Sequence, residues 1–401
     1  MDAIAEEYVK LVLAAGRHDP DLVDAYYGPP EWKAEAEAGT VALPELKARV
    51  GALVGEAEAR QPHPAAAIEH LHILRAAYLL RQLQALGARL DVLAGKRLTF
   101  DEESRALYDA VAPHHPEEHF AAILAELEPL VPGDGPLPAR VEAYRQRFVI
   151  PPDRLDAVFR AAIDECRRRT LAHVTLPPGE SFAVEYVSGR PWSAYNWYKG
   201  GFHSLIQVNT ELPIFVDRAI DLACHEGYPG HHVYNALLEK HLVRDRGWVE
   251  YSVYNLFSPQ SLIAEGTANF GIEVAFPGAE RVAFERERLF SLAGLDPASA
   301  EEYYRVHRLL QRLSYAGNEA ARRYLDGEID AAAAADWLVR YALYSPERAK
   351  QRVAFFDKYR SYVINYNLGQ DLVKRYVERA AGASPARRWA AFAELLSSPR
   401  L

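Results

Sequence analysis

The sequence has few cysteines, no long apolar run and no excess of positive charge. Cys166 and Cys224 are the only cysteines in 401 residues, too few for a disulfide framework, and this scarcity favours a reducing compartment. No stretch comes close to about 18 uninterrupted apolar residues, the length that spans a membrane, so we expect no membrane partner. The formal net charge of −9 argues against a nucleic-acid partner, which requires a basic patch.

The N-terminal stretch also lacks the features of a secretory signal. It is acidic before its short apolar run, and it has neither a basic segment nor a suitable cleavage site. Hydrophobic residues make up 49% of the chain, which is enough for a sizeable core. We therefore expect a soluble, cytoplasmic protein.

Most of the chain has the periodicity of α-helices and is rich in Ala, Leu, Glu and Arg. The exception is a run of β-branched and aromatic residues at about 182–210, broken by Gly-Arg-Pro and Gly-Gly, which predicts a small meander of two or three strands. A segment rich in proline and glycine near 128–141 is typical of a linker. We predict a mainly α fold, with a helical N-terminal region at 1–135 roofing a cleft and a catalytic region at 136–401.

The stretch LACHEGYPGHHVYNALLEK contains a His-Glu pair followed by two more histidines. A zinc hydrolase helix commonly carries H-E-x-x-H, but here Pro229 stands in the place of the second histidine. In an unbroken helix, His231 would lie about 240° around the axis from His225, and His232 would lie roughly 10 Å along it. Because zinc–nitrogen bonds are about 2.0–2.1 Å long, a regular helix cannot place either pair on one zinc ion.

Pro229 and Gly230 change this conclusion. Pro229 cannot donate a hydrogen bond to the carbonyl of His225, and its ring clashes there, while Gly230 permits an unusual backbone. We therefore expect the helix at about 212–240 to kink, bulge or break at this point. If the two extra residues loop out, His231 takes the position of the second histidine.

The same helix is predicted to begin with Thr210 as its N-cap, Glu211 in its first turn and Pro213 just inside. His232 remains an alternative to His231 as the ligand. Otherwise we interpret it as a neighbour that points away, a supporting contact behind the ligands or a contact for the substrate.

A second helix is predicted at about 259–275, between a Ser-Pro start and a Pro-Gly stop. Glu265 falls in the interior of this apolar helix, where a buried carboxylate needs a partner, and a metal ion supplies one. Asn269 follows one turn later on the same face. Its side chain can hold the second ring nitrogen of a ligand histidine.

The segments HEGYPGHH and AEGTANFGIE together resemble a large bacterial family of uncharacterised proteins placed among the zincin-type peptidases. Its members carry H-E-x-x-P-G-H and a later E-G-x-A-x-Y/F, and the family is similar to gluzincins, in which two histidines and a downstream glutamate bind zinc. The resemblance implies a zincin-like fold in which His225, His231 and Glu265 bind one Zn²⁺ ion. It also implies that Glu226 is the general base.

The resemblance extends over about 200–275, including VNT at 208–210. It continues at YNLG, 366–369, which is similar to a Y-x-x-G segment of the family. The departure lies just upstream, where family members tend to have Pro-Gly-Gln and this chain has RSY.

The mechanism that the resemblance implies needs a second donor for the developing oxyanion besides the metal. Tyr366 is the first candidate and Arg360 the next, since both lie in the region of the C-terminal family segment. The strand that ends at Asn209 is expected to lie beside the cleft as an edge strand and to bind an extended peptide substrate through its backbone. Asn209, at the end of this strand, is predicted to contact the substrate.

The function we predict is zinc-dependent hydrolysis of small or unfolded peptides. Two alternatives stay open: a non-catalytic metal- or ligand-binding helical protein on a zincin scaffold, and a metal hydrolase of another amide or ester. Two histidines with one carboxylate favour zinc, although manganese and cobalt bind similar sets. A rival cluster, HHPEEH at His114–His119, we interpret as a helix start, with proline first and acidic residues in the first turn.

Overall fold

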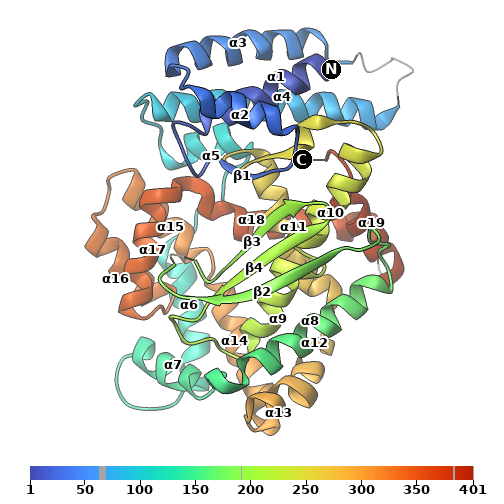
Figure 1. Ribbon diagram of the computed structural model, residues 1–401. Coiled ribbons are helices and arrows are strands. Elements are labelled where there is room, and N and C mark those ends of the chain that lie inside the picture. The colour runs from blue at the N-terminus through green and yellow to red at the C-terminus, as the bar shows by residue number, and fades with distance from the viewer. Residues whose placement is uncertain (63–68, 191, 383, 401) are drawn as a thin grey trace.

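Helices make up most of the structure, a computed structural model that describes residues 1–62, 69–190, 192–382 and 384–400 (Figure 1). The mainly α fold class predicted from the sequence is confirmed. The elements of the N-terminal part are α1 (Asp2–Ala15), β1 (Val23–Tyr26), α2 (Pro30–Ala38), α3 (Leu43–Ala59), α4 (His70–Leu93), α5 (Phe100–Tyr108), α6 (Glu117–Leu127), α7 (Leu137–Gln146) and α8 (Leu155–Leu171).

The first four helices form a layer at one end of the molecule and contact the later elements directly (Figure 1). The strand β1 pairs antiparallel with β5 (Val253–Asn255). On α4, Nε of Arg75 lies 2.5 Å from Oε1 of Glu250 in a buried ion pair, and the hydroxyl of Tyr78 donates a 2.7 Å hydrogen bond to Gln260. Because Gln260 opens the helix that carries Glu265, these contacts fix that helix from the N-terminal side.

The three strands β2 (Ser181–Val187), β3 (Ala194–Gly200) and β4 (His203–Asn209) form a small sheet where the sequence predicted one. Their order is β2-β4-β3, with β4 in the centre, parallel to β2 and antiparallel to β3. The predicted meander is therefore wrong, because a meander would place β3 in the centre. The predicted role of β4 as an edge strand is wrong for the same reason, since both of its backbone edges are paired.

The helix that follows the sheet begins later than predicted. Thr210 is not its N-cap, because the backbone N–H of Thr210 donates to the carbonyl of Val187 at 2.9 Å and continues the sheet. A β-bridge between Val149 and Phe215 then keeps the chain extended. The helix α9 (Asp217–Leu222) starts only after this bridge. Pairing with a distant segment thus overrides the local capping signals.

The helix predicted at 259–275 is present as α11 (Pro259–Ala275), with Ser258 as N-cap and proline at its first position. It is buried on nearly all sides, which explains why it is apolar all round. The other elements of the second half are α10 (His231–Leu238), α12 (Glu280–Phe284), α13 (Phe290–Ala293), α14 (Ala300–Arg312), α15 (Ala316–Leu325), α16 (Ala331–Tyr341), α17 (Pro346–Tyr359), α18 (Ile364–Ala381) and α19 (Pro385–Leu396).

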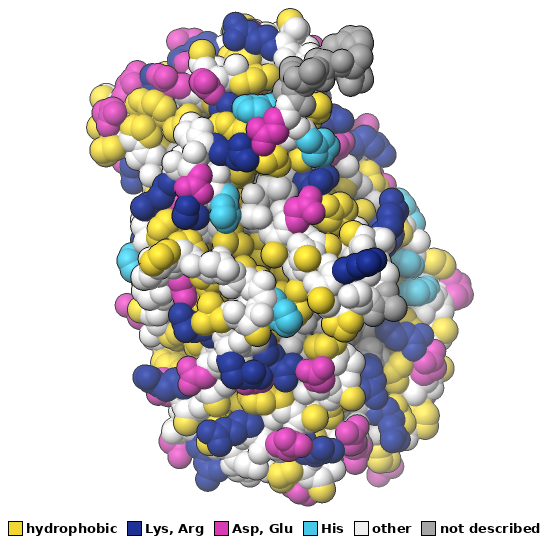
Figure 2. All heavy atoms as spheres, turned by 90° about the vertical axis from the view of Figure 1, so that its right-hand side faces the viewer, with side chains coloured by type: hydrophobic (Ala, Val, Ile, Leu, Met, Phe, Trp, Pro, Cys, Tyr) yellow, Lys and Arg dark blue, Asp and Glu magenta, His cyan; other side chains and the backbone are white. Residues whose placement is uncertain are grey.

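The molecular surface carries charges of both signs. On the face shown in Figure 2, basic and acidic side chains are interspersed, and apolar side chains lie between them. Among the described residues, no helix combines the length and the apolar character needed to cross a membrane.

Candidate metal centre

The helix breaks between the two predicted histidine ligands. At its end, α9 widens into a π-helical turn, Ala223–Gly227, and α10 begins at His231. The N–H of Gly230 donates to the carbonyl of Cys224 at 2.9 Å and closes the intervening loop. A Cβ at this glycine would collide with the carbonyl oxygen of His225, so no larger residue fits here without a backbone shift. The predicted break of the helix is confirmed.

Glu265 of α11 completes a compact cluster with the two histidines. Its Oε2 lies 3.2 Å from Nε2 of His225 and 3.7 Å from Nε2 of His231. The three donor atoms all lie within 4.8 Å of one another, and no second group of this kind occurs among the described residues. Ligand atoms in a tetrahedral zinc site lie about 3.5 Å apart at bond lengths of about 2.1 Å, so the spacing matches a shared ion.

The hydrogen bonds around the cluster leave its donor atoms available for a metal. Nδ1 of His225 lies 2.9 Å from Oδ1 of Asn269, so Nδ1 carries its N–H toward Asn269 and Nε2 is the ring nitrogen that faces the cluster. Oε2 of Glu265 is buried and is not assigned a hydrogen bond from any residue that the structure describes. A buried carboxylate oxygen that faces two imidazole nitrogens can share a cation with them. These residues can therefore hold a metal ion, and their donor set suits zinc.

The charges of the cluster shift the pKa values of its members apart. Burial opposes the charged form of His225, but Glu265 and Glu226 outweigh this effect and raise its pKa to about 9. Burial and the charge of His225 lower the pKa of His231 to about 4. Burial also raises the pKa of Glu226 to about 7. A carboxyl group that titrates near neutral pH can both accept and return a proton.

Two groups behind the ligands hold them in place. The hydroxyl of Tyr362 donates a 2.8 Å hydrogen bond to Oε1 of Glu265, the oxygen that faces away from the histidines. The amide of Asn269 donates to the carbonyl of Tyr366 at 2.9 Å, so this side chain connects His225 to α18. Asn269 was predicted from the sequence, but Tyr362 was not. Tyr362 lies in the same C-terminal segment as Tyr366, which was predicted.

The glycines of the two motif segments allow α11 and α18 to approach closely. A Cβ on Gly266 would lie 2.5 Å from the carbonyl carbon of Gly369 and 2.9 Å from Cγ2 of Val373. The backbones of the two helices are therefore in contact at this point. This contact explains why glycine follows Glu265 on α11 and why the YNLG segment ends in glycine on α18. The close approach also allows Tyr362 to reach Glu265.

His232 points away from the cluster and toward the sheet. Its Nδ1 lies 2.9 Å from Oγ of Ser204, and its Nε2 lies 3.0 Å from Oε2 of Glu180. The hydroxyl of Tyr228 donates to the same carboxylate at 2.6 Å. Both ring nitrogens of His232 are thus engaged by protein groups, and this buried network fixes the loop between the two histidines. The structure places His231, and not His232, beside His225.

Two predicted site residues have other partners. Nε of Arg360 lies 2.6 Å from Oε2 of Glu103. Arg360 is also not among the described residues that line the cavity in front of the metal cluster, so its predicted oxyanion role is wrong. The side-chain amide of Asn209 donates to the carbonyls of Arg190 and Trp192 at 2.9 and 3.1 Å and stabilises the loop before β3. Asn209 does not line the cavity either, and its predicted contact with the substrate is wrong.

A cavity of about 1060 Å³ opens in front of the cluster and is lined by all three donors, Glu226 and Tyr366. One wall comes from β3 and the residues before it, so β3 is the strand of the three-stranded sheet that borders the cavity. Asp24 of β1, which was not predicted as a site residue, also lines this space and accepts a hydrogen bond from Tyr195 of β3. Burial raises the pKa of Asp24 to about 7. No sequence motif marks Asp24, because only the β1–β5 pairing brings it to the cavity.

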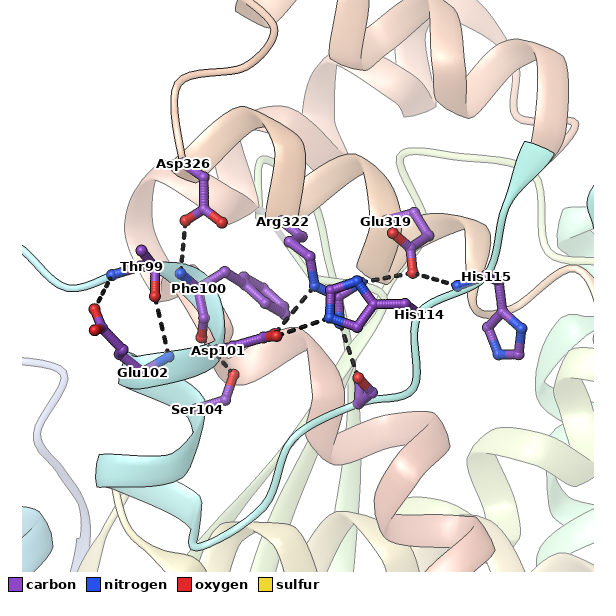
Figure 3. Close-up of polar contacts among 11 residues, drawn as sticks. Thr99, Phe100, Asp101, Glu102, Ser104, His114, His115, Glu319, Arg322 and Asp326 are labelled. Atoms are coloured by element: carbon purple, nitrogen blue, oxygen red, sulfur yellow. Dashed lines mark hydrogen bonds and ion pairs between the residues drawn. The ribbon is translucent and has the colours of Figure 1, made fainter.

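The rival cluster at His114–His119 has a structural role, as predicted. Figure 3 shows Nε2 of His114 pointing to Asp101, at 2.8 Å, and the backbone N–H of His115 donating to Glu319, at 2.9 Å. Arg322 bridges the two carboxylates, with nitrogens 3.0 Å from Asp101 and 2.6 Å from Glu319. These contacts connect α5 to α15. The helix α6 begins at the next residues, with Pro116 as its N-cap.

Comparisons with known proteins support the fold. No family model matches the sequence, and no curated protein is significantly similar to it. Several solved structures are similar in fold, among them the following two. A "putative lipoprotein" from Colwellia psychrerythraea has a TM-score of 0.53 at 14% identity, over 87% of this chain and 69% of that chain. An M32 carboxypeptidase from Deinococcus radiodurans R1 has a TM-score of 0.50 at 12% identity, over 99% of this chain and 88% of that chain.

Identities this low show the fold alone. The chain is a mainly helical protein, similar in fold to an M32 carboxypeptidase, with a His-His-Glu cluster that can hold a metal ion.

Proposed function

We propose that this protein is a zinc-dependent metallohydrolase that cleaves peptide bonds. The observation that carries the proposal is the buried Oε2 of Glu265 facing the Nε2 atoms of His225 and His231 at 3.2 and 3.7 Å, with Glu226 on the wall of the same cavity. The similarity in fold to an M32 carboxypeptidase supports a peptidase in particular. The bacterial family membership, the peptide partner and the cytoplasmic location stay predictions.

In this proposal the metal supplies a Lewis acid that polarises the scissile carbonyl. Glu226 takes a proton from the attacking water and returns it to the leaving amine, for which a pKa near 7 is suited. The hydroxyl of Tyr366, on the cavity wall, donates a hydrogen bond to the developing oxyanion. Tyr362 and Asn269 hold Glu265 and His225 in their orientations. An extended peptide lies along β3, the outer strand beside the cavity.

The test compares the wild type with Glu226→Gln and a matched control, Glu273→Gln. Glu273 lines the same cavity from α11, the helix that carries Glu265, but its carboxylate lies 2.7 Å from Nζ of Lys374. Zinc-loaded proteins are incubated with a mixture of short peptides, and cleavage is followed by mass spectrometry. We expect cleavage by the wild type and the control, and a loss of about 100-fold or more in Glu226→Gln at equal zinc content.

Other results would point to the alternatives. A zinc-loaded wild type that cleaves no peptide but hydrolyses esters or acylated amines would be a hydrolase of another class. A zinc-loaded protein that cleaves none of these compounds would be a non-catalytic metal-binding protein. Activity in Glu226→Gln equal to that of the wild type would exclude Glu226 as the general base.

A further inference from the structure

Arginines from three helices gather on the wall of the cavity that contains the candidate metal centre. Arg145 comes from α7, Arg218 from α9, and Arg348 and Arg352 from α17. We call these four residues the arginine cluster. The three helices are far apart in the sequence, so the fold, and not a local run of basic residues, assembles the cluster.

Most of the cluster has no acidic partner. Arg218 lies 3.1 Å from Asp221, but within the described parts of the chain no carboxylate lies within 4.0 Å of the other three guanidinium groups. Nε of Arg145 is buried and has no hydrogen-bond acceptor among the same residues. A buried guanidinium without an acceptor is costly in free energy. The cavity wall therefore carries guanidinium N–H donors that can bind an anion.

Aromatic rings fix the positions of these guanidinium groups. Each of the three unpaired arginines lies over a ring, a contact that holds the flat group but leaves the N–H donors at its rim available. The distances from Cζ to the ring centroid are 4.0 Å for Arg145 on Phe215, 4.6 Å for Arg348 on Tyr344 and 4.3 Å for Arg352 on Phe355.

The four positive charges also repel one another. Arg348 and Arg352 are four residues apart on α17 and share one face of the helix. Burial and the charges of the other three arginines lower the pKa of Arg348 below its usual range. Burial alone would raise the pKa of Tyr344, but the four arginines lower it. A bound anion would relieve this repulsion.

The cluster lies next to the candidate metal centre. Cζ of Arg352 is 5.6 Å from the ring centroid of Tyr366, and that ring is 5.8 Å from the ring of Tyr362, which donates to Glu265. Arg218 and Glu226 line the same cavity. The metal centre and the arginines line one cavity, so a peptide bound at the metal centre can extend toward the arginines.

We propose that the arginine cluster binds a carboxylate group of the substrate. The inference rests on the proposed peptidase function, because a carboxylate is the anion that unmodified peptides carry, and the fork of a guanidinium group matches it with two parallel hydrogen bonds. Two sources supply this chemistry: the C-terminal carboxylate of a short peptide and the side chain of an acidic residue.

The test measures binding in zinc-loaded Glu226→Gln protein, so that turnover does not interfere. Isothermal titration compares three probes: N-acetyl-trialanine, its C-terminal amide, and N-acetyl-Ala-Ala-Glu amide. We expect the free acid to bind at least about tenfold more tightly than the trialanine amide, the effect of about one charge-assisted contact. Adding Arg348→Gln and Arg352→Gln together should abolish the difference. Adding Lys350→Gln instead, an exposed cation on the same helix that does not line the cavity, should preserve it.

The probes separate the two sources. Tight binding of the Glu amide and weak binding of the free acid would support the carboxylate site and assign it to a side chain. Equal affinity for all three probes would overturn the proposal, and so would a preference that survives the double substitution. The comparison of probes on the arginine-intact protein decides the question even if the double variant does not fold. A clear preference in a protein whose wild type cleaves no peptide would contradict the proposed function alone.

Discussion

The substitution Gly266→Ala should push α11 and α18 apart and damage the metal centre. The new Cβ would lie 2.5 Å from the carbonyl carbon of Gly369 and 2.9 Å from Cγ2 of Val373. Because non-bonded carbons rest about 3.5–4.0 Å apart, the helices must separate by about 1 Å. That shift lengthens the 2.8 Å hydrogen bond from Tyr362 to Glu265 beyond its useful range.

The expected loss of stability follows from these contacts. Overpacking costs about 1–3 kcal/mol, and loss of a hydrogen bond to a buried carboxylate costs about 1.5–3 kcal/mol. The higher helix propensity of alanine returns about 1 kcal/mol, so we expect a net destabilisation of about 1.5–5 kcal/mol. Urea unfolding followed by circular dichroism measures it. The control is Gly51→Ala on α3, where a Cβ meets no atom within 4 Å and stability should not fall. If Gly266→Ala unfolded at the wild-type urea concentration and retained zinc, the close contact would have no role.

Three further substitutions test separate parts of the site. Tyr366→Phe should lower kcat by about 10- to 1000-fold with little change in KM, because it removes a donor used mainly in the transition state; unchanged turnover would exclude this tyrosine. Gly230→Ala should lower both zinc content and thermal stability, since the loop between the histidines cannot accommodate a Cβ, and a variant with wild-type zinc content would contradict that reading. Glu180→Gln should reduce the loss of thermal stability that the protein shows as the pH falls below about 4.5. Burial opposes ionisation of Glu180, but hydrogen bonds from His232, Tyr228 and Arg167 lower its pKa from 4.5 to about 2. Its ionisation therefore stabilises the fold above about pH 4.5, and this contribution is lost as pH falls toward 2. Melting temperatures at several pH values should show a steeper acid loss in the wild type than in the variant, and parallel profiles would contradict the assignment.

The parts of the site that could be predicted from sequence are those determined by local geometry. His225, Pro229, Gly230 and His231 lie within seven residues, and the constraints on proline and glycine backbones predict a break there without knowledge of the fold. Glu265 could be identified because an acidic residue is unusual inside an apolar helix. The strands could be located by composition, since runs of β-branched and aromatic residues favour the extended backbone of a strand.

The errors arose where distant segments meet. The order of the sheet depends on β2 pairing with β4 across the intervening strand, and the true start of α9 depends on the bridge between Val149 and Phe215. Arg360 was predicted to face the oxyanion from its place in the C-terminal family segment, but it pairs with Glu103 of α5, a partner that no local pattern indicates. Asp24 and Glu180 were missed for the same reason. Long-range pairing leaves no local pattern in the sequence, and only the folded chain shows it.

The central claim is that His225, His231 and Glu265 together bind one metal ion. Elemental analysis of protein purified without added metal, before and after zinc is offered, tests it most directly. His231→Ala is compared with His114→Ala, because His114 pairs with Asp101 and is not among the described residues that line the cavity. We predict about one zinc ion per chain in the wild type and in His114→Ala, and a loss of zinc in His231→Ala. A wild type that takes up no zinc, or a His231→Ala variant that retains it in full, would contradict the account.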